Sequence, residues 1–538
     1  MDGRKESAST HTPPGWRPYT HRQVLQVLGG LITAMLTATI STSIISTALP
    51  TIMGDLGGQE QLPWVASAPL LAMTATAPLW GKVSDLFGRK RMFQTALVIY
   101  ALASVAAGLS QNVAMLIAAR ALQGLGAGGV TSLTQVVLGD IVEPRERGRY
   151  AGYLGSAFGV ATVAGPLLGG LLVDAPGMGW RACFLVPVPL AVGSFLLIQK
   201  VLRLPPVDRG RPRIDWLGAL TIAGGASTVM VVLSLGGTSF PWNSGWTYGL
   251  TALSLALLAA AVVAERRAAE PILPPRLLRD RTFVLTSAAS LLVGMVMFGV
   301  MIFLPQYLQV VRGMSPTASG LMTLPLVVGM LTASTVAGQL TTRTGRYKIF
   351  PVCGLTLLAC GALLLSRLHT DSPLVLIGTD CAVAGIGLGL TMQTLILAAQ
   401  NAVPRADLAA ATTGVAFFRS LGSAVGVAAF GAILTARLTS GLADRLRAAR
   451  LPVPDDVGTG LGTPAEIRAL PEPLRGFLLD SYTAGLQTVY LVGVPLAVGG
   501  LLAVLALREL PLRTSAPAEP TAVDPVKPAA RSAESSSA

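Results

Sequence analysis

The stretch GKVSDLFGRKR, residues 81–91, decides the fold because it joins two long apolar runs through a short basic turn. Gly81 allows two helices to approach closely, and Gly88 suits the turn. Asp85 is placed to face the positive end of a neighbouring helix. Three basic residues follow that suit lipid headgroups and helix C-termini: Arg89, Lys90 and Arg91. From the residues alone, this is a basic turn on one side of a membrane.

The rest of the chain is that of a membrane protein. Of its 538 residues, 52% are hydrophobic and 12% are charged, a balance too apolar for an ordinary soluble protein. A bilayer core about 30 Å thick needs roughly 20 apolar residues per helix. The sequence predicts fourteen such helices, at residues 24–50, 63–80, 92–109, 112–138, 150–174, 181–201, 214–236, 246–264, 283–305, 315–340, 349–366, 373–399, 406–436 and 485–507. The predicted fold class is an all-α polytopic membrane protein.

The basic residues follow one side of the predicted membrane. With the N-terminus inside, 29 of the 40 Lys and Arg residues lie on inner segments, and 3 lie in short outer loops. Because cytoplasmic loops are enriched in Lys and Arg, both termini are predicted to be cytoplasmic. This sidedness accounts for the net charge of +13, so we expect a lipid bilayer and no nucleic acid as partner.

No pattern in the sequence predicts a metal site, a cofactor or an enzyme. The four cysteines fall in predicted helices and lack the spacing of a disulfide framework or metal site. The three histidines (His11, His21 and His369) lie in the N-terminal tail and an outer loop, where they form no buried cluster. No nucleotide-binding loop is visible. We therefore expect that the protein is not an enzyme and that it draws its energy from a proton gradient. We also expect it to be a monomer.

The chain contains a coarse internal repeat. Gly81 and Arg89 align with Gly338 and Arg346 at an offset of 257 residues, and Arg120 aligns with Asp380 at an offset of 260. Such a repeat predicts two six-helix halves with a transport site between them near the membrane midplane. The predicted segments are a cytoplasmic tail at 1–23, an N-terminal half at 24–203, a linker with two inserted helices at 204–282, a C-terminal half at 283–510 that includes a long extracellular segment at 437–484, and a disordered cytoplasmic tail at 511–538.

Two motifs carry a family resemblance. The spacing G-x-x-x-D-x-x-G-R-K within residues 81–91 resembles the signature loop of the major facilitator superfamily. GPLLGG at 165–170 resembles the helix-5 antiporter motif of its exporters, with Gly165, Pro166, Gly169 and Gly170 at the motif positions. Together with residues 180–189, 303–325 and 417–428, they make the chain similar to the 14-helix drug:proton antiporter family, the EmrB/QacA group. This resemblance spans roughly residues 25–510.

The resemblance implies the major facilitator fold and proton-coupled export of lipophilic molecules, including cationic drugs, across the cytoplasmic membrane of a bacterium. Export of one antibiotic or metabolite made by the same cell is an alternative. An importer of a small metabolite is the first rival, and GPLLGG argues against it. A membrane-embedded enzyme is a second rival, which the scattered histidines disfavour.

Helix 1 departs from the family pattern. The family usually has an Asp there, in a stretch resembling L-D-x-T-I-V-N-V-A-L-P, whereas residues 40–50 read ISTSIISTALP. Ser41 stands where the Asp would be, Ser43 at the Thr and Ser46 at the Asn. Because the family's coupling or cation-recognition carboxylate is missing, we expect neutral or monovalent substrates rather than divalent cations.

Asp380 is the one carboxylate predicted at membrane depth, which makes it a functional candidate. Arg120 is its predicted counter-ion, and residues 120–128 resemble the helix-4 motif credited with proton transfer. A carboxylate that pairs with an arginine in one state and separates in another would bind and release a proton during the cycle. A permanent structural ion pair, an Asp that caps backbone groups and recognition of a cationic substrate are the alternatives.

Several other polar residues are predicted within the membrane. Arg419 lies deep in the thirteenth helix, where it is either a structural latch or a gate. Residues that could contact a substrate are Ser41, Ser43, Ser46, Gln123, Gln393 and Trp64. Hydrogen bonding between helices is the alternative for the serines and glutamines.

Overall fold

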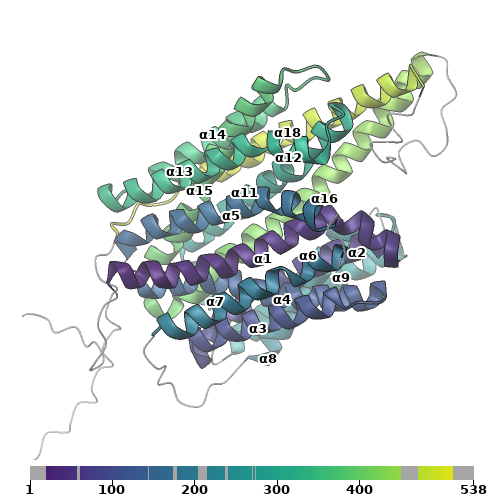
Figure 1. The fold of residues 1–538 in the computed structure, drawn as a ribbon. Coiled ribbons are helices and arrows are strands. Elements are labelled where there is room, and N and C mark those ends of the chain that lie inside the picture. Colours follow the sequence, from purple (N-terminus) through teal and green to yellow (C-terminus); the bar gives the residue numbers. More distant parts are fainter. Residues whose placement is uncertain are drawn as a thin grey trace, which may run out of the picture.

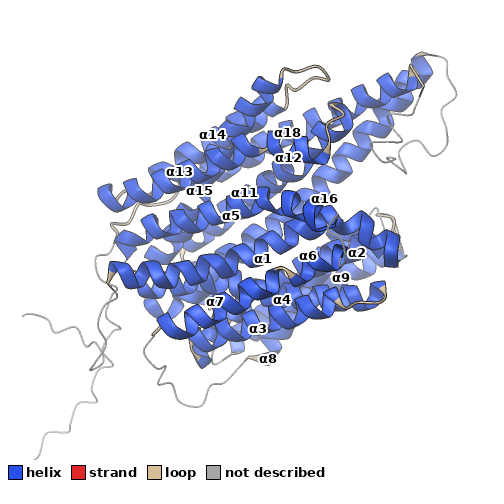
Figure 2. Ribbon diagram, viewed as in Figure 1, coloured by secondary structure: helices blue, strands red, loops and turns tan. Residues whose placement is uncertain are grey.

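The computed structural model describes residues 20–56, 61–142, 144–173, 179–203, 215–236, 240–268, 271–272, 274–449 and 471–512. The regular structure of these residues is helical (Figure 2), and each of the fourteen predicted apolar runs lies on a helix. Ten described helical stretches are long and apolar enough to cross a membrane, and two shorter apolar stretches lie at Leu217–Leu233 and Ile349–Leu365. The all-α membrane fold is confirmed.

The helices fall into two groups with a pair between them. The first group comprises α1 (His21–Leu56), α2 (Leu62–Phe87), α3 (Arg89–Gly108), α4 (Val113–Ile141), α5 (Pro144–Val173), α6 (Ala182–Leu185) and α7 (Pro187–Val201). The pair is α8 (Trp216–Leu235) and α9 (Gly245–Arg267). The second group comprises α10 (Pro275–Arg279), α11 (Arg281–Gln306), α12 (Pro316–Met322), α13 (Leu324–Thr344), α14 (Ile349–Leu365), α15 (Leu374–Ala402), α16 (Leu408–Ala448) and α18 (Leu474–Leu505).

Packing within each group follows the predicted repeat. In the first group α4 packs against α2 and α3, and α1 packs against α5. In the second, α15 packs against α13 and α14, and α11 packs against α16. The two groups meet along α5 and α13 and along α2 and α16, with α8 resting on α2 and α16. Figure 1 shows the two groups of roughly parallel helices, the first below and the second above.

Small residues set how closely the helices approach. A Cβ added at Gly426 of α16 would lie 2.6 Å from the Cα of Met295 on α11. Gly385 of α15 lies directly against the backbone of Leu326 on α13. Helices within a bilayer associate through such close packing, because lipid tails are as apolar as leucine and supply no hydrophobic drive.

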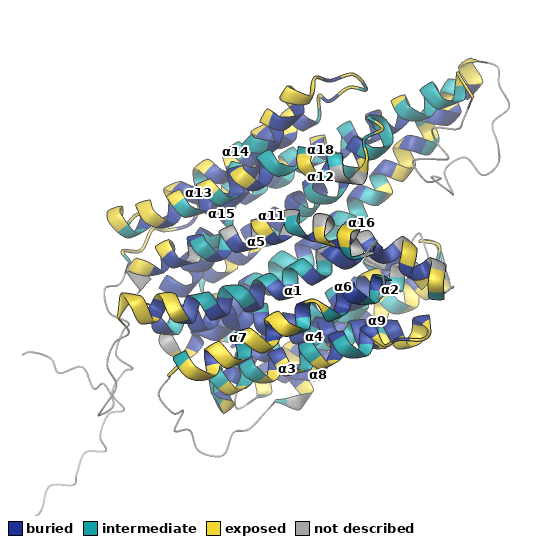
Figure 3. Ribbon diagram, in the orientation of Figure 1, coloured by how far each residue is buried: buried dark blue, intermediate teal, exposed yellow. Residues whose placement is uncertain are grey.

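Large apolar side chains remain exposed on the outside of the bundle. Leu102 of α3, Leu220 of α8 and Val375 of α15 are 66, 69 and 80% exposed. Exposed and half-buried positions run along the outer faces of the helices in Figure 3. Such a surface suits lipid rather than water.

The end of the bundle that holds the α2–α3 turn is here called the basic end. It also holds the α4–α5 connection and the start of α16, since Arg89 contacts Asp140 and Gly139 lies against Leu408. The other end holds the α15 N-terminus and the far parts of α16 and α18.

Helices α16 and α18 are longer than their predicted apolar runs. The 41 residues of α16 span about 60 Å, twice a bilayer core, and the two helices project together beyond their neighbours (Figure 1). Leu438, Leu442 and Leu446 recur every fourth residue and are buried, and Arg445 donates a 2.6 Å hydrogen bond to Ser481. The predicted extracellular segment 437–484 is therefore helical at both its ends, and its middle lies outside the described residues.

Candidate functional site

Arg89 links the signature turn to the neighbouring helix α4. Its guanidinium lies 2.5 Å from Asp85 at the end of α2 and 2.8 Å from Asp140 at the end of α4, and it donates a 2.6 Å hydrogen bond to Ser84. Arg89 and Asp85 are about one-tenth exposed, so both charges are largely shielded from water. The sequence predicted Asp85 and Arg89, but it missed Asp140.

The other residues of the turn take separate roles. Gly88 has a φ of +94°, a conformation that favours glycine. A Cβ added at Gly81 would lie 2.7 Å from Oγ1 of Thr413, so Gly81 allows α2 to meet α16 across the two halves. Lys90 donates a 2.7 Å hydrogen bond to the carbonyl of Gln199 on α7, and Arg91 is exposed.

The GPLLGG stretch lies within α5, which stays helical through it. Gly165 and Gly169 are buried. The side-chain surroundings of Pro166 and Gly170 lie outside the described part of the structure. α5 packs against α1 in its own half and against α13 in the other, so the stretch is carried by a helix at the interface between the halves.

Arg120 lies inside the N-terminal half. It donates a 2.8 Å hydrogen bond to the Gln123 amide oxygen and a longer bond, 3.4 Å, to the carbonyl of Val65 on α2. Gln123 in turn donates to Ser104 on α3 and to Ser41 on α1, at 2.8 and 3.3 Å. Four helices are thus joined by one buried polar network, and Ser41 and Gln123 serve interhelical hydrogen bonding here.

The predicted ion pair between Arg120 and Asp380 is not formed in this structure. Arg120 uses the network above, and no described residue forms a hydrogen bond or ion pair with the Asp380 carboxylate. Asp380 is only 2% exposed, although it lies just seven residues into α15 from the end opposite the basic end. The two side chains occupy corresponding places in separate halves. A separated pair is one of the two states that the coupling prediction requires.

The remaining predicted contact residues are dispersed. Trp64 lies on α2 and is half-buried. Ser43 and Ser46 lie on α1, and their side chains are outside the described part of the structure. Gln393 lies on α15 within hydrogen-bonding distance of Gln135 on α4. Gln393 is therefore the one described glutamine of the predicted set that reaches the other half.

The halves are in contact near the basic end. Nε2 of Gln135 lies 3.4 Å from Oε1 of Gln393. Closer to that end, a Cβ on Gly139 of α4 would lie 2.9 Å from Leu408 and 3.3 Å from Gln400. Gln400 itself donates a 3.1 Å hydrogen bond to Thr412 on α16. These contacts close the space between the halves on the basic side.

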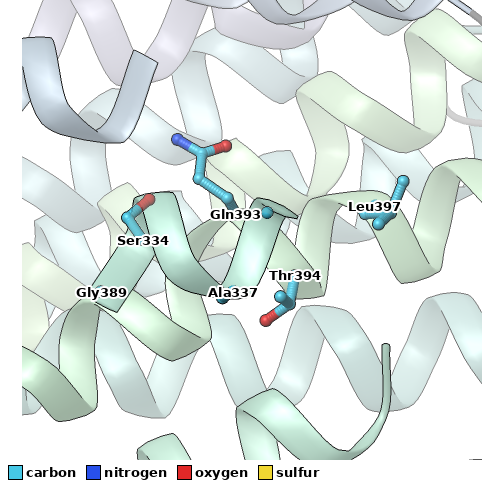
Figure 4. A pocket seen from close by; sticks show the side chains of 7 residues that line it. Ser334, Ala337, Gly389, Gln393, Thr394 and Leu397 are labelled. Atoms are coloured by element: carbon cyan, nitrogen blue, oxygen red, sulfur yellow. The ribbon is translucent and has the colours of Figure 1, made fainter. Parts of the chain in front are cut away.

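A small pocket lies beside this contact, between α13 and α15. Its lining comprises Ser334, Ala337, Gly338, Gly389, Gln393, Thr394 and Leu397. Figure 4 shows the polar ends of Ser334 and Gln393 extending to the same side, with Thr394 extending to the other. The Ser334 hydroxyl is buried and has no hydrogen-bond partner among the described groups. The sequence prediction missed Ser334 and Gln135. Each is a polar residue within a predicted apolar helix, and that was the only feature that could have indicated them.

Two helical halves that enclose a polar centre and close against each other at one end define a multi-pass membrane transporter. The family model of the Major Facilitator Superfamily matches residues 31–427, which is more than half of the chain. The chain therefore belongs to this superfamily.

Relatives match over most of the chain. An uncharacterised MFS-type transporter of Mycobacterium tuberculosis is 40% identical over 487 residues, covering 90% of this chain and 70% of its own length. The multidrug transporter MdtP of Bacillus subtilis is 32% identical, covering 86% of this chain and 82% of its own. Multidrug resistance protein 3 of Bacillus subtilis is 27% identical, covering 91 and 96%.

Solved structures share the fold. The human organic anion transporter MFSD10 has a TM-score of 0.58 at 14% identity, covering 89% of this chain and 99% of its own. The proton:xylose symporter XylE has a TM-score of 0.57 at 14% identity, covering 90 and 95%. At these identities the likeness establishes the fold alone.

Proposed function

We propose that this protein exports a lipophilic small molecule across the cytoplasmic membrane in exchange for protons, as a member of the 14-helix drug:proton antiporter group. The multidrug transporters among its relatives, with their matches along most of both chains, support export. The helices that cover all fourteen predicted runs support the group assignment. The termini would then face the cytoplasm, and the basic end would be the cytoplasmic end.

The observation that carries proton coupling is the state of Asp380. It is a carboxylate with 2% exposure and no described hydrogen-bond or ion-pair partner. An intramembrane carboxylate is stable when it is protonated or when a cation approaches it. A conformational change that alters its exposure would therefore alter its proton occupancy, which is what coupling to a gradient requires.

Exchange would proceed by alternating access. In the structure the halves touch near the basic end through Gln135 and Gln393. Opening these contacts and closing the opposite end would move a central site from one side of the membrane to the other. Arg89, held by Asp85 and Asp140, would keep the ends of α2, α3 and α4 together while the halves move, because all three residues lie in the N-terminal half.

Everted membrane vesicles test the direction and the energy source. The chain is expressed in a host that lacks its own efflux pumps, and vesicles are energised to acidify their interior. We expect a fluorescent lipophilic substrate to accumulate inside the vesicles, and a protonophore to release it. A panel of cationic, neutral and anionic dyes identifies the probe. Accumulation only in right-side-out vesicles would establish the rival importer instead.

A further inference from the structure

The inner stretch of α16 places Arg419 in the centre of the molecule. Arg419 lies seven residues after Thr412, so the two side chains share nearly the same face of the helix. Thr412 faces α15, where it accepts a hydrogen bond from Gln400, and Leu408 on the same face lies against Gly139 of α4. Arg419 therefore faces α15 and α4 about 10 Å further from the basic end.

Gln393 and Gln135 occupy the same level. Gln393 lies seven residues from Gln400 on α15, which again repeats the helix face and adds about 10 Å. Gln135 lies one turn from Gly139 on α4, and its amide meets that of Gln393. By helix geometry the Arg419 guanidinium therefore lies at about the level of these two amides, beyond the contacts at the basic end.

One residue of this group, Gln393, lines the pocket between α13 and α15. Arg419, Gln393 and Gln135 are each half-buried. Away from the basic end, the neighbouring stretches 121–134, 382–392 and 420–430 contain no charged residue. Arg419, Gln393 and Gln135 are here called the polar floor, and the helix stretches beyond them are uncharged.

The charge of the floor is positive and uncompensated. The Arg419 side chain has no hydrogen bond or ion pair among the described residues. The acidic residue nearest to Arg419 in sequence, Asp407, pairs with Arg276, and Asp140 at the end of α4 pairs with Arg89. Leaving a charge unpaired in a membrane protein is costly unless a ligand or water compensates it.

We propose that the polar floor binds the anionic head of a lipophilic substrate, with the Arg419 guanidinium on its carboxylate and the Gln393 and Gln135 amides beside it. A guanidinium suits this role because it can form two parallel hydrogen bonds to a carboxylate. The uncharged helices would take the apolar body. The substrate class is then a lipophilic acid rather than the cationic drug that the family resemblance implies. This inference rests on the proposed transport function, whose central site the floor would form.

Binding of three matched probes tests it: a dansylated undecanoic acid, its primary amide and the corresponding dansylated amine. They differ only in the head group and are titrated by fluorescence against the purified full-length protein in detergent. We expect the acid to bind about tenfold more tightly than the amide, the effect of one charged hydrogen-bonding partner. Equal binding of the three probes, preference for the amine or no binding of the acid would overturn the proposal.

Variants assign the preference to the floor. R419Q should abolish the preference for the acid, and R419K should keep most of it. R447Q is the matched control, because it removes the same charge from an exposed residue on the projecting part of α16. Should R419Q fail to fold, Q393E provides an internal carboxylate for Arg419 and should also abolish the preference. If folded R419Q or Q393E retains the preference, the floor does not bind the acid.

The assay separates this inference from the proposed function. It needs no gradient and no membrane, so the acid preference is measured even if the protein does not exchange protons. Selective binding without proton-driven transport would contradict the proposed function and leave the floor in place. Proton-driven export of neutral or cationic dyes, without selective binding of the acid, would support the proposed function and overturn the proposal that the floor binds an acid.

Discussion

Ser41 shows how one residue changes the chemistry of the N-terminal half. Ser41 stands where the drug:proton antiporter group usually has an Asp in helix 1. It accepts a hydrogen bond from Gln123, and Gln123 accepts one from Arg120. The network therefore holds one cation and no anion. The substitution S41D would restore a carboxylate at this position of α1.

We expect S41D to extend transport to divalent cationic dyes, since the new carboxylate adds a negative site to helix α1. The ratio of divalent to monovalent dye export, measured in the same vesicles as the wild type, checks this. S41N is the control, because it has nearly the same size and no charge. Equal ratios in S41D and S41N would show that the helix-1 carboxylate does not set this preference.

Asp380 provides the second residue-scale prediction. D380N keeps the shape and removes the titratable group, so we expect gradient-driven transport to fall at least about tenfold, the loss of a required proton step. Exchange of labelled for unlabelled substrate, which needs no net proton movement, should persist. D480N, on α18, is the control for a carboxylate elsewhere. Gradient-driven transport by D380N at the wild-type rate would assign coupling to another group.

The sequence identified residues whose chemistry is local and missed those defined by a partner. Asp85, Arg89 and Gly81 stand out because spacing places them in one turn. Asp140 and Gln135 gain their roles only when α4 packs against other helices, and a polar residue near a helix end carries no distinct pattern. The sequence predicted that Arg120 and Asp380 form an ion pair, but their side chains are apart in the structure.

At the scale of elements, adding one methyl group at Gly81 tests the contact between α2 and α16. A Cβ at Gly81 would lie 2.7 Å from Thr413, so G81A should push the two helices apart at the basic end. G249A on α9 is the matched control, because its Cβ would meet nothing within 4 Å. Replacing glycine by alanine stabilises a helix by about 1 kcal/mol in both variants. A difference between the variants therefore does not come from helix propensity.

The readout is the reactivity of a cysteine at position 400, in a background without the four native cysteines. Gln400 is 6% exposed and lies between the halves. We expect labelling by a water-soluble maleimide to be several-fold faster in G81A than in G249A, which corresponds to a shift of about 1 kcal/mol between the two states. Equal labelling rates would mean that the α2–α16 contact does not control closure.

Hydropathy predicted the existence of the elements well and their ends less well. The far part of α16 was missed because it is held by an apolar stripe at every fourth residue rather than by a continuous apolar run. A search for membrane spans stops where charges begin, whereas an amphipathic helix pair continues past them. The short helix α10 was also missed, because it contains no long apolar run.

At the scale of the whole molecule, the repeat predicted two halves, and packing within each half agrees with it. The sequence could not predict which end of the central space is closed. Two states of a transporter share one sequence and differ by a few kcal/mol, so local patterns favour neither. The contacts of Gly139 with Leu408 and of Gln135 with Gln393 define the state closed at the basic end.

Simultaneous measurement of proton and substrate flux in proteoliposomes tests the account most directly. Purified protein is reconstituted with a pH-sensitive dye inside, and the probe that binds most tightly is added on one side without an imposed gradient. We predict that substrate movement in one direction drives proton movement in the other, at a fixed ratio, and that D380N loses the proton signal. Substrate movement without any proton counterflow in the wild type would contradict proton-coupled export.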